Sequence, residues 1–219
     1  GLGDVYKRQE QKKMQAFLKS PEWKRTTAQG WGVNRAETAE IFTANQMYIR
    51  KFPDRAASLL GKLHCQHYGL PSFGKRLAAA TREFVPFSGD PAGWFAQNGR
   101  FTDFSGKTIE LPERTFATHT SGKYTAARVP LLDVIAEVLR QPDEVWLNNY
   151  DGKAFDCLNY IRFYRDKAIN VVCRIENGKT LAVRTWFEIA IRPTTRSGGK
   201  IAPEKDPRLK YRRGLLVKK

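Results

Sequence analysis

The sequence has few cysteines and no long apolar run, and each shortage excludes a class of protein. Its 219 residues include only three cysteines, Cys65, Cys157 and Cys173. These are too few and too scattered for a disulfide framework, which favours a reducing compartment. No stretch approaches the roughly 18 consecutive apolar residues of a membrane span. We therefore expect neither a disulfide-stabilised secreted domain nor a membrane partner.

Residues that hold metal ions or cofactors are also sparse. The only histidine–cysteine cluster is His64-Cys65-Gln66-His67, which has no second ligand pair and is better explained as a helix end. Phosphate-binding loops, HExxH motifs, paired CxxC motifs and clustered carboxylates of the DxD type are all missing. The sequence therefore predicts no metal site and no cofactor, which argues against a two-metal nuclease.

Positive charge is what the chain has in excess. It carries 38 Lys and Arg against 22 Asp and Glu, a formal net charge of +16. Such a balance favours a polyanionic partner, with nucleic acid ahead of an anionic membrane surface, although plain solubility explains it too. The hydrophobic fraction of 41% is sufficient for a core.

The chain is expected to divide near residue 110 into a helical region, 1–110, and an α+β domain, 111–219. Residues 1–9 resemble a recurrent spurious translation, so the chain is expected to be a fragment and these residues carry no weight here. In the first region, helices are expected at 10–29, from Asn34, at 53–64 and at 72–82. Residues 84–111 are punctuated by Pro, Gly, Asp and Ser, which predicts a loop with one hairpin around DFSGKTIEL.

The second region changes to a period of two. A short amphipathic helix is expected at 131–139, stopped by Gln141-Pro142. Strands are expected at 144–148, 158–165, 168–175, 181–189 and 215–218, with Asn177-Gly178 as a hairpin turn. This order predicts an α+β fold in which a helix packs on a four- to five-stranded antiparallel sheet.

Strand alternation predicts which side chains share the open face of that sheet. With the apolar set turned toward the helix, the opposite face would carry these arginines and aromatic residues: Tyr160, Arg162, Tyr164, Arg174, Arg184 and Trp186. Guanidinium groups bind phosphates and flat rings stack on unpaired bases, so this set is suited to single-stranded RNA. The alternative is that the arginines solvate an exposed sheet face.

His119 is the one histidine in the second region and the candidate for proton transfer. Its imidazole titrates near neutral pH, and metal-independent RNA cleavage needs a group that takes the proton of the 2′-hydroxyl. Lys123 and Arg128 follow closely and are suited to holding a phosphate. The alternative is an exposed polar loop that leads into the next helix.

Five segments in this order resemble a known nuclease family: HTSGKY, LLDVIAEVLRQPDEVWL, YIRFYRDKAINVV, RTWFEI and RRGLLVKK. Together they resemble the phage-associated barnase–EndoU–colicin–RelE-like (BECR) nucleases, found at the C-terminus of Mu F-like minor head or head-morphogenesis proteins. The resemblance covers about residues 111–219. It implies an RNase-like fold with the active site on the open face of the sheet.

The resemblance also implies roles for single residues. His119 would be the general acid or base and Lys123 a nearby cation, with Arg184 and Thr185 as a polar pair in the last long strand. Alternation turns Thr185 inward and Arg184 outward, so either a bulge intervenes or only one of the two is in the site. Arg212 and Arg213 would contact phosphate before the final strand.

Three functions remain open on the sequence alone. The leading one is a metal-independent ribonuclease domain of a phage head protein, with RNA, or else DNA, and phage head or portal components as partners. The second is a structural head domain that binds nucleic acid without cleaving it. The third is the RNase tip of a polymorphic toxin. A virion or the host cytoplasm is the expected location.

Overall fold

The structure is a computed structural model, which describes residues 61, 65, 68–148, 157–176, 180–191, 199 and 207–219. The helices expected before residue 61, the Asn177-Gly178 turn and most of the loop at 192–207 lie outside these residues. The chain divides into two compact units. The first comprises Gly1–Ser72, Trp146–Phe155 and Arg192–Val217, and the second comprises Phe73–Val145, Asp156–Ile191 and Lys218–Lys219.

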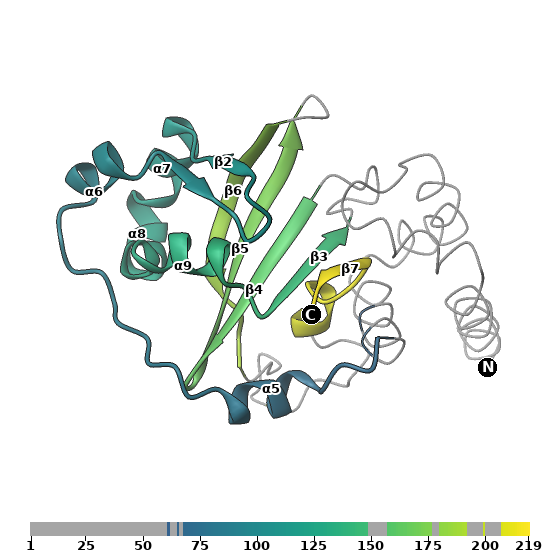
Figure 1. Cartoon of the computed structure of the whole chain (residues 1–219). Coiled ribbons are helices and arrows are strands. Elements are labelled where there is room, and N and C mark those ends of the chain that lie inside the picture. The colour runs from purple at the N-terminus through teal and green to yellow at the C-terminus, as the bar shows by residue number, and fades with distance from the viewer. Residues whose placement is uncertain are drawn as a thin grey trace, which may run out of the picture. The chain divides into compact units, whose positions relative to one another are not determined.

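The described part of the chain is a mixed α+β structure around one sheet, which confirms the expected fold class (Figure 1). Its α-helices are α5 (Phe73–Ala79), α6 (Pro91–Gln97), α7 (Glu113–His119), α8 (Thr125–Arg128) and α9 (Val134–Arg140). Its strands are β1 (Arg100–Thr102), β2 (Thr108–Glu110), β3 (Glu144–Asn148), β4 (Cys157–Tyr164), β5 (Lys167–Glu176), β6 (Thr180–Glu188) and β7 (Leu215–Lys218).

The sheet has seven strands in the order β1-β2-β6-β5-β4-β3-β7, more than the four or five expected. The additional strands come from the β1–β2 hairpin, which adds to the meander because β2 pairs in parallel with β6. The antiparallel β4–β5–β6 meander itself follows the sequence expectation. Helices α7, α8 and α9 pack on one side of this sheet (Figure 1).

Asp103 explains why the hairpin forms where it does. One carboxylate oxygen, Oδ1, accepts hydrogen bonds from the backbone N–H groups of Ser105 and Lys107 at 2.8 and 2.9 Å. The other, Oδ2, accepts one from the hydroxyl of Tyr160 at 2.9 Å. Gly106 takes a positive φ of 83° in this turn, a conformation that glycine adopts without strain. The carboxylate therefore fixes both the turn and its attachment to β4.

Helix α6 lies in a region where the sequence predicts only loop and hairpin. Asp90 caps it by accepting hydrogen bonds from the backbone N–H groups of Ala92 and Gly93, and Pro91 occupies the first turn. Trp94 anchors the helix in the core and donates from its indole nitrogen to Asp133 at 2.9 Å. The Pro and Gly residues that indicated a loop instead start this short helix.

A bulge interrupts the pairing of β5 with β6. Val172 pairs with Thr185 and Cys173 pairs with Val183, so Arg184 is an extra residue without a partner in the register. An extra residue reverses the alternation of side chains beyond it. Trp186 therefore shares a face with Val183, and Thr185 lies on the opposite face. The intervening bulge expected as one alternative is present, and Thr185 nevertheless lies on the face opposite Trp186.

The prediction that Tyr160, Arg162 and Trp186 lie on a solvent-exposed face of the sheet is wrong. Tyr160 and Trp186 are 0% exposed and Arg162 is 5% exposed, because these side chains face the layer of α7, α8 and α9. Tyr164 is buried as well. All eight residues of β4 are buried, so apolar alternation in that strand does not distinguish a core face from a solvent face.

Arg162 shows how a cation is accommodated on this covered face. Its guanidinium donates to the backbone oxygen of Gln141 and forms an ion pair with Glu137 of α9 at 2.8 Å. The side chain thus connects β4 to α9 instead of meeting solvent.

Burial raises the pKa of the Tyr160 phenol well above its usual range, so the hydroxyl stays protonated and donates to Asp103.

In the first unit, Arg212 and Arg213 are buried, at 0% and 7% exposure, before β7. Arg212 donates to the backbone oxygen of Pro71 at 3.0 Å, and Arg213 donates to that of Lys210 at 3.1 Å. Because both side chains are buried, their expected contact with phosphate would require them to become exposed first.

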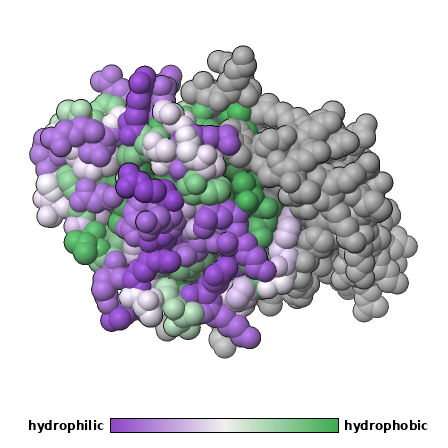
Figure 2. All heavy atoms as spheres, in the orientation of Figure 1, coloured by the Kyte–Doolittle hydropathy of each residue, from purple (hydrophilic) through white to green (hydrophobic). Residues whose placement is uncertain are grey.

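The surface carries one strongly exposed large apolar side chain among the residues described, Val85. Figure 2 shows hydrophilic side chains over most of the described face in that view, with small hydrophobic patches between them. Among the described residues, no helix is long and apolar enough to cross a membrane.

Candidate active site

The segment that carries His119 folds into three short helical elements against β6. Helix α7 ends at His119, a 3₁₀ turn (Gly122–Tyr124) follows, and α8 completes the segment. Gly122 takes a positive φ of 56°, which allows the tight change of direction after Ser121. The alternative of an exposed polar loop does not hold, because the histidine lies at the end of a helix packed on the sheet.

His119 is held between the bulge of β6 and two aromatic rings. Its Nε2 lies 2.9 Å from the backbone oxygen of Arg184. Because a carbonyl oxygen only accepts, Nε2 carries the proton in this bond and Nδ1 of the neutral ring keeps a lone pair. The rings of Trp186 and Tyr124 meet the imidazole edge-on, with centroids 5.3 and 5.7 Å away.

The surroundings favour the neutral imidazole. Burial is the main cause that lowers the pKa of His119, and the positive charges of Arg128 and Arg184 lower it further. The hydrogen bond to the backbone of Arg184 acts in the opposite direction, and the net effect is a lowered pKa. A histidine that is neutral at pH 7 is able to accept a proton, which is the role of a general base.

Arg128 and Trp186 lock α8 to β6 beside this ring. The guanidinium of Arg128 donates to the backbone oxygen of Trp186, and the indole of Trp186 donates to the backbone oxygen of Arg128 at 3.0 Å. The Arg128 guanidinium also lies over the ring of Phe187, 5.2 Å from its centroid. This reciprocal pair fixes both the indole that packs on His119 and the cation that acts on its pKa.

Lys123 and Arg184 supply two exposed cations at the edge of the same cluster. The Lys123 ammonium lies 5.1 Å from the ring centroid of Tyr124, which in turn contacts His119. Arg184 projects from the bulge whose carbonyl oxygen holds the imidazole. Three of the four expected catalytic residues, His119, Lys123 and Arg184, therefore belong to one region of the structure.

Other residues expected from the sequence are not part of that cluster. Thr185 is half-buried on the opposite face of β6, and Arg174 is exposed on that same opposite face of β5. Tyr160 and Arg162 lie beneath the helices, and only Trp186 among the expected RNA-binding aromatic residues touches His119. Arg212 and Arg213 belong to the first unit.

Tyr124 contributes to the cluster and was not singled out in the sequence, and neither was Phe187, which meets Arg128 of the cluster from the opposite face of β6. Tyr124 follows His119 by five residues, a spacing that regular helical periodicity does not bring onto one face, and the 3₁₀ turn makes the contact. Phe187 was expected in the core, and the bulge moves it to the other face of β6. Within the described ranges, no three His, Cys, Asp or Glu residues come together as a candidate metal site.

Comparison with known proteins gives one match. The family model described as phage-Barnase-EndoU-ColicinE5/D-RelE like nuclease2 matches residues 86–217. Searches of curated proteins and of solved structures return no match. The matched segment includes the β1–β2 hairpin and α6, and it therefore begins before the expected domain boundary at residue 111.

Proposed function

Since this chain belongs to the phage barnase–EndoU–colicin E5/D–RelE-like nuclease family, we propose that it cleaves RNA without a metal ion and that His119 is its general base. The observation that carries the proposal is the half-buried imidazole of His119, which is bonded to the Arg184 carbonyl oxygen and lies near enough to the cations Arg128 and Arg184 for them to lower its pKa. Family membership supplies the nuclease of phage origin. RNA as the substrate and the residue roles are our proposal.

The proposed reaction begins with proton transfer to His119. The imidazole accepts the proton of the 2′-hydroxyl, the 2′-oxygen attacks phosphorus, and the bond to the 5′-oxygen breaks. The products are a 2′,3′-cyclic phosphate and a free 5′-hydroxyl, whose proton comes from water. Deoxyribose has no 2′-hydroxyl, so this reaction selects RNA over DNA.

The resting geometry of His119 sets one requirement for this step. Its Nε2 is bonded to the Arg184 carbonyl oxygen, and its Nδ1 is buried without a hydrogen-bond partner among the described residues. Nδ1 keeps the lone pair, so the ring must give up its bond to the Arg184 carbonyl oxygen and turn until Nδ1 reaches the 2′-hydroxyl. Giving up one hydrogen bond of this kind costs about 1 kcal/mol, which is small beside the contribution of general-base catalysis.

Arg184 and Lys123 are suited to the negative charge that develops on the phosphorane. Both side chains are exposed: Arg184 projects from the bulge of β6, and Lys123 lies over the ring of Tyr124, which contacts the imidazole. Arginine donates two parallel N–H groups to phosphate, and lysine acts as a point charge. Arg128 is fixed by its exchange of hydrogen bonds with Trp186, so we assign it a positioning role.

A second candidate function is nucleic-acid binding without cleavage, as in a structural protein of the phage head. The hydrogen bond of His119 and its buried Nδ1 favour it, because an imidazole bonded to a backbone carbonyl oxygen also serves to attach α7 to β6. For either candidate function, we propose phage head or portal proteins as partners and the virion or host cytoplasm as the location.

The substrate class is tested with three labelled strands of identical sequence in EDTA: RNA, DNA, and RNA in which every 2′-hydroxyl is methylated. We expect cleavage of the RNA alone, with products that end in a 2′,3′-cyclic phosphate. Equal cleavage of the methylated RNA or of the DNA would rule out attack by the 2′-hydroxyl. Tight binding of RNA without any cleavage would favour the structural alternative.

A further inference from the structure

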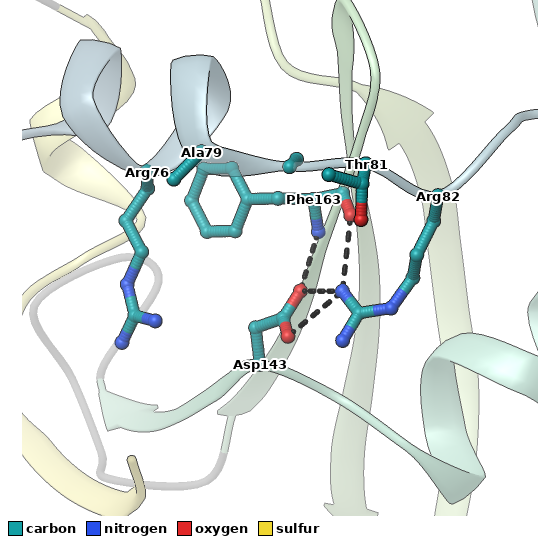
Figure 3. Close-up of a pocket in the computed structure, with 7 residues that line it drawn as sticks. Arg76, Ala79, Thr81, Arg82, Asp143 and Phe163 are labelled. Carbon is teal, nitrogen blue, oxygen red and sulfur yellow. Dashed lines mark hydrogen bonds and ion pairs between the residues drawn. The ribbon is translucent and has the colours of Figure 1, made fainter.

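A small pocket opens beside α5 in the second unit. Its volume is about 250 Å³, and its lining comes from α5 with the residues that follow it, from the residue before β3 and from the end of β4. The lining residues are Arg76, Ala79, Ala80, Thr81, Arg82, Asp143 and Phe163. Figure 3 shows Arg76 and Arg82 on two sides of it, with Asp143 next to Arg82.

Arg82 is fixed through a single nitrogen. Its Nη1 lies 2.9 and 2.8 Å from the two carboxylate oxygens of Asp143 and 3.2 Å from the backbone oxygen of Phe163 (Figure 3). The backbone N–H of Phe163 donates to Asp143 at 2.7 Å, which fixes the carboxylate in turn. Nε and Nη2 of Arg82 have no hydrogen-bond acceptor within the described ranges, and the side chain is 42% exposed. Their N–H groups are available to a ligand.

Arg76 is fixed in a similar way from the other side. Its Nε donates to the buried carboxylate of Glu144 at 3.2 Å, while neither of its two terminal nitrogens meets an acceptor in the part of the chain that is described. The side chain is 27% exposed. Each arginine is thus oriented by one contact and keeps further N–H groups for another partner. Less side-chain entropy is lost on binding when the donor is already oriented.

The charge of the pocket limits what it binds. Arg76 and Arg82 are balanced by Asp143 and Glu144, so the attraction comes from directed N–H groups and not from an excess of positive charge. Guanidinium groups match phosphate oxygens in geometry, often with two parallel hydrogen bonds. A phosphodiester, which carries one negative charge and several acceptor oxygens, fits this set with modest affinity.

The pocket is separate from the His119 cluster. Trp186, which contacts His119, pairs with Val171, and Val171 pairs with Tyr160, so Tyr160 lies two strands away on the same face. Phe163 is three residues further along β4 and points to the opposite face. With strands about 4.8 Å apart and about 3.3 Å per residue, the separation along the sheet is roughly 14 Å. One phosphate group cannot occupy both places.

We propose that this pocket binds a backbone phosphate of the RNA strand several nucleotides away from the bond cleaved at His119. The inference rests on the proposed function for the identity of the ligand and extends it to a second contact with the same strand. Arg82 and Arg76 donate to the phosphate oxygens, and Asp143 keeps Arg82 in place.

The test measures binding without cleavage. The probe is a fluorescein-labelled, fully 2′-O-methylated RNA of about twelve nucleotides, and its affinity is measured by fluorescence anisotropy at several salt concentrations. The variants are Arg76→Gln and Arg82→Gln. Arg100→Gln is the matched control, because Arg100 is also an ion-paired arginine but lies on β1, outside the pocket. Arg82→Lys keeps the charge and loses the fork of N–H groups.

We expect each pocket glutamine variant to bind the probe about tenfold more weakly, with a salt slope reduced by about 0.7, while Arg100→Gln stays within about twofold of wild type. We expect Arg82→Lys, with unchanged melting temperature, to lose most of the affinity as well. The proposal would be overturned if the pocket variants bound the probe as tightly as the wild type. It would also be overturned if Arg100→Gln lost as much affinity as the pocket variants. If the wild type does not cleave RNA but the pocket variants still bind the probe more weakly, the proposed reaction is refuted and the pocket assignment stands.

Discussion

The imidazole of His119 donates its Nε2 proton to the backbone oxygen of Arg184, 2.9 Å away, and Arg184 is the extra residue of the bulge in β6. The bond fixes the tautomer of the histidine and leaves Nδ1 as the basic nitrogen. It also joins the end of α7 to the one irregular point of the β5–β6 pairing. Bulges occur often beside active sites, where they redirect a side chain. Here the bulge presents a carbonyl oxygen to the histidine and a guanidinium to solvent.

Stability should depend on pH through His119. Because burial lowers its pKa below 6.5 in the folded state, the unfolded chain binds more protons at this position as the pH falls through 6.5. The free energy of unfolding of the wild type should therefore decrease relative to His119→Gln between about pH 7.5 and about pH 5.5. Urea denaturation of both proteins across this range measures it. A pH-independent difference, or a wild type that gains stability toward low pH, would contradict the lowered pKa.

Replacing Arg128 by alanine should raise the pKa of His119. The substitution removes a positive charge that acts on the imidazole and the donor to the backbone oxygen of Trp186. The pKa is measured by NMR titration of the histidine ring signals, which requires no catalysis. Arg114→Ala is the control. Arg114 is an exposed cation on α7, the helix that carries His119, and it is not among the charges that act on the pKa of His119. An unchanged titration in Arg128→Ala, or an equal shift in Arg114→Ala, would show that Arg128 has no specific effect.

Asp103 should be a major determinant of stability in the β1–β2 hairpin. Alanine there leaves the hydroxyl of Tyr160 and the N–H groups of Ser105 and Lys107 without their acceptor, which should cost about 4 kcal/mol. Tyr160→Phe removes one of these bonds and should cost about 2 kcal/mol. Urea denaturation of both single variants and of the double variant measures their coupling.

Because the two side chains share one hydrogen bond, the double variant should lose less stability than the sum of the single losses. Ser105→Ala, which removes the hydroxyl donor to Asp103 and an exposed acceptor of Lys107 but keeps both backbone N–H bonds to the carboxylate, serves as the mild control. Additive losses would mean that the Tyr160–Asp103 bond contributes little to stability.

The strands were predictable because each one carries its own local signal. The expected strands at 144–148 and 215–218 coincide with β3 and β7, and β4, β5 and β6 differ from their expected ranges by a residue or two. Long β-branched and aromatic runs with turn residues between them specify these elements locally. Helices α6 and α7 were not predicted, because each buries a single side chain, Trp94 or Phe116, and so has no apolar period. Helix α9 is equally short but buries four apolar side chains, which made it recognisable.

Three of the four catalytic candidates chosen from the sequence lie in one region, while their roles stay a prediction and their surroundings were not predictable. His119, Lys123 and Arg184 were expected from residue type and family resemblance, and they lie in one cluster. The faces of Tyr160, Arg162 and Trp186 could not be read from the sequence. Arg162 and Tyr160 are polar residues satisfied by Glu137, Gln141 and Asp103, and such partners are set by tertiary packing. A bulge likewise changes alternation without any sequence signal as clear as a glycine or proline.

The central claim is tested most directly by the rate at which purified protein and its His119→Gln variant cleave labelled RNA in excess EDTA. Glutamine can keep a hydrogen bond to the Arg184 carbonyl oxygen but cannot accept a proton near neutral pH. We predict that the wild type cleaves and that the variant, with a melting temperature close to that of wild type, is slower by at least about a hundredfold. A variant that cleaves within a few-fold of the wild-type rate would contradict the assignment of His119 as the general base.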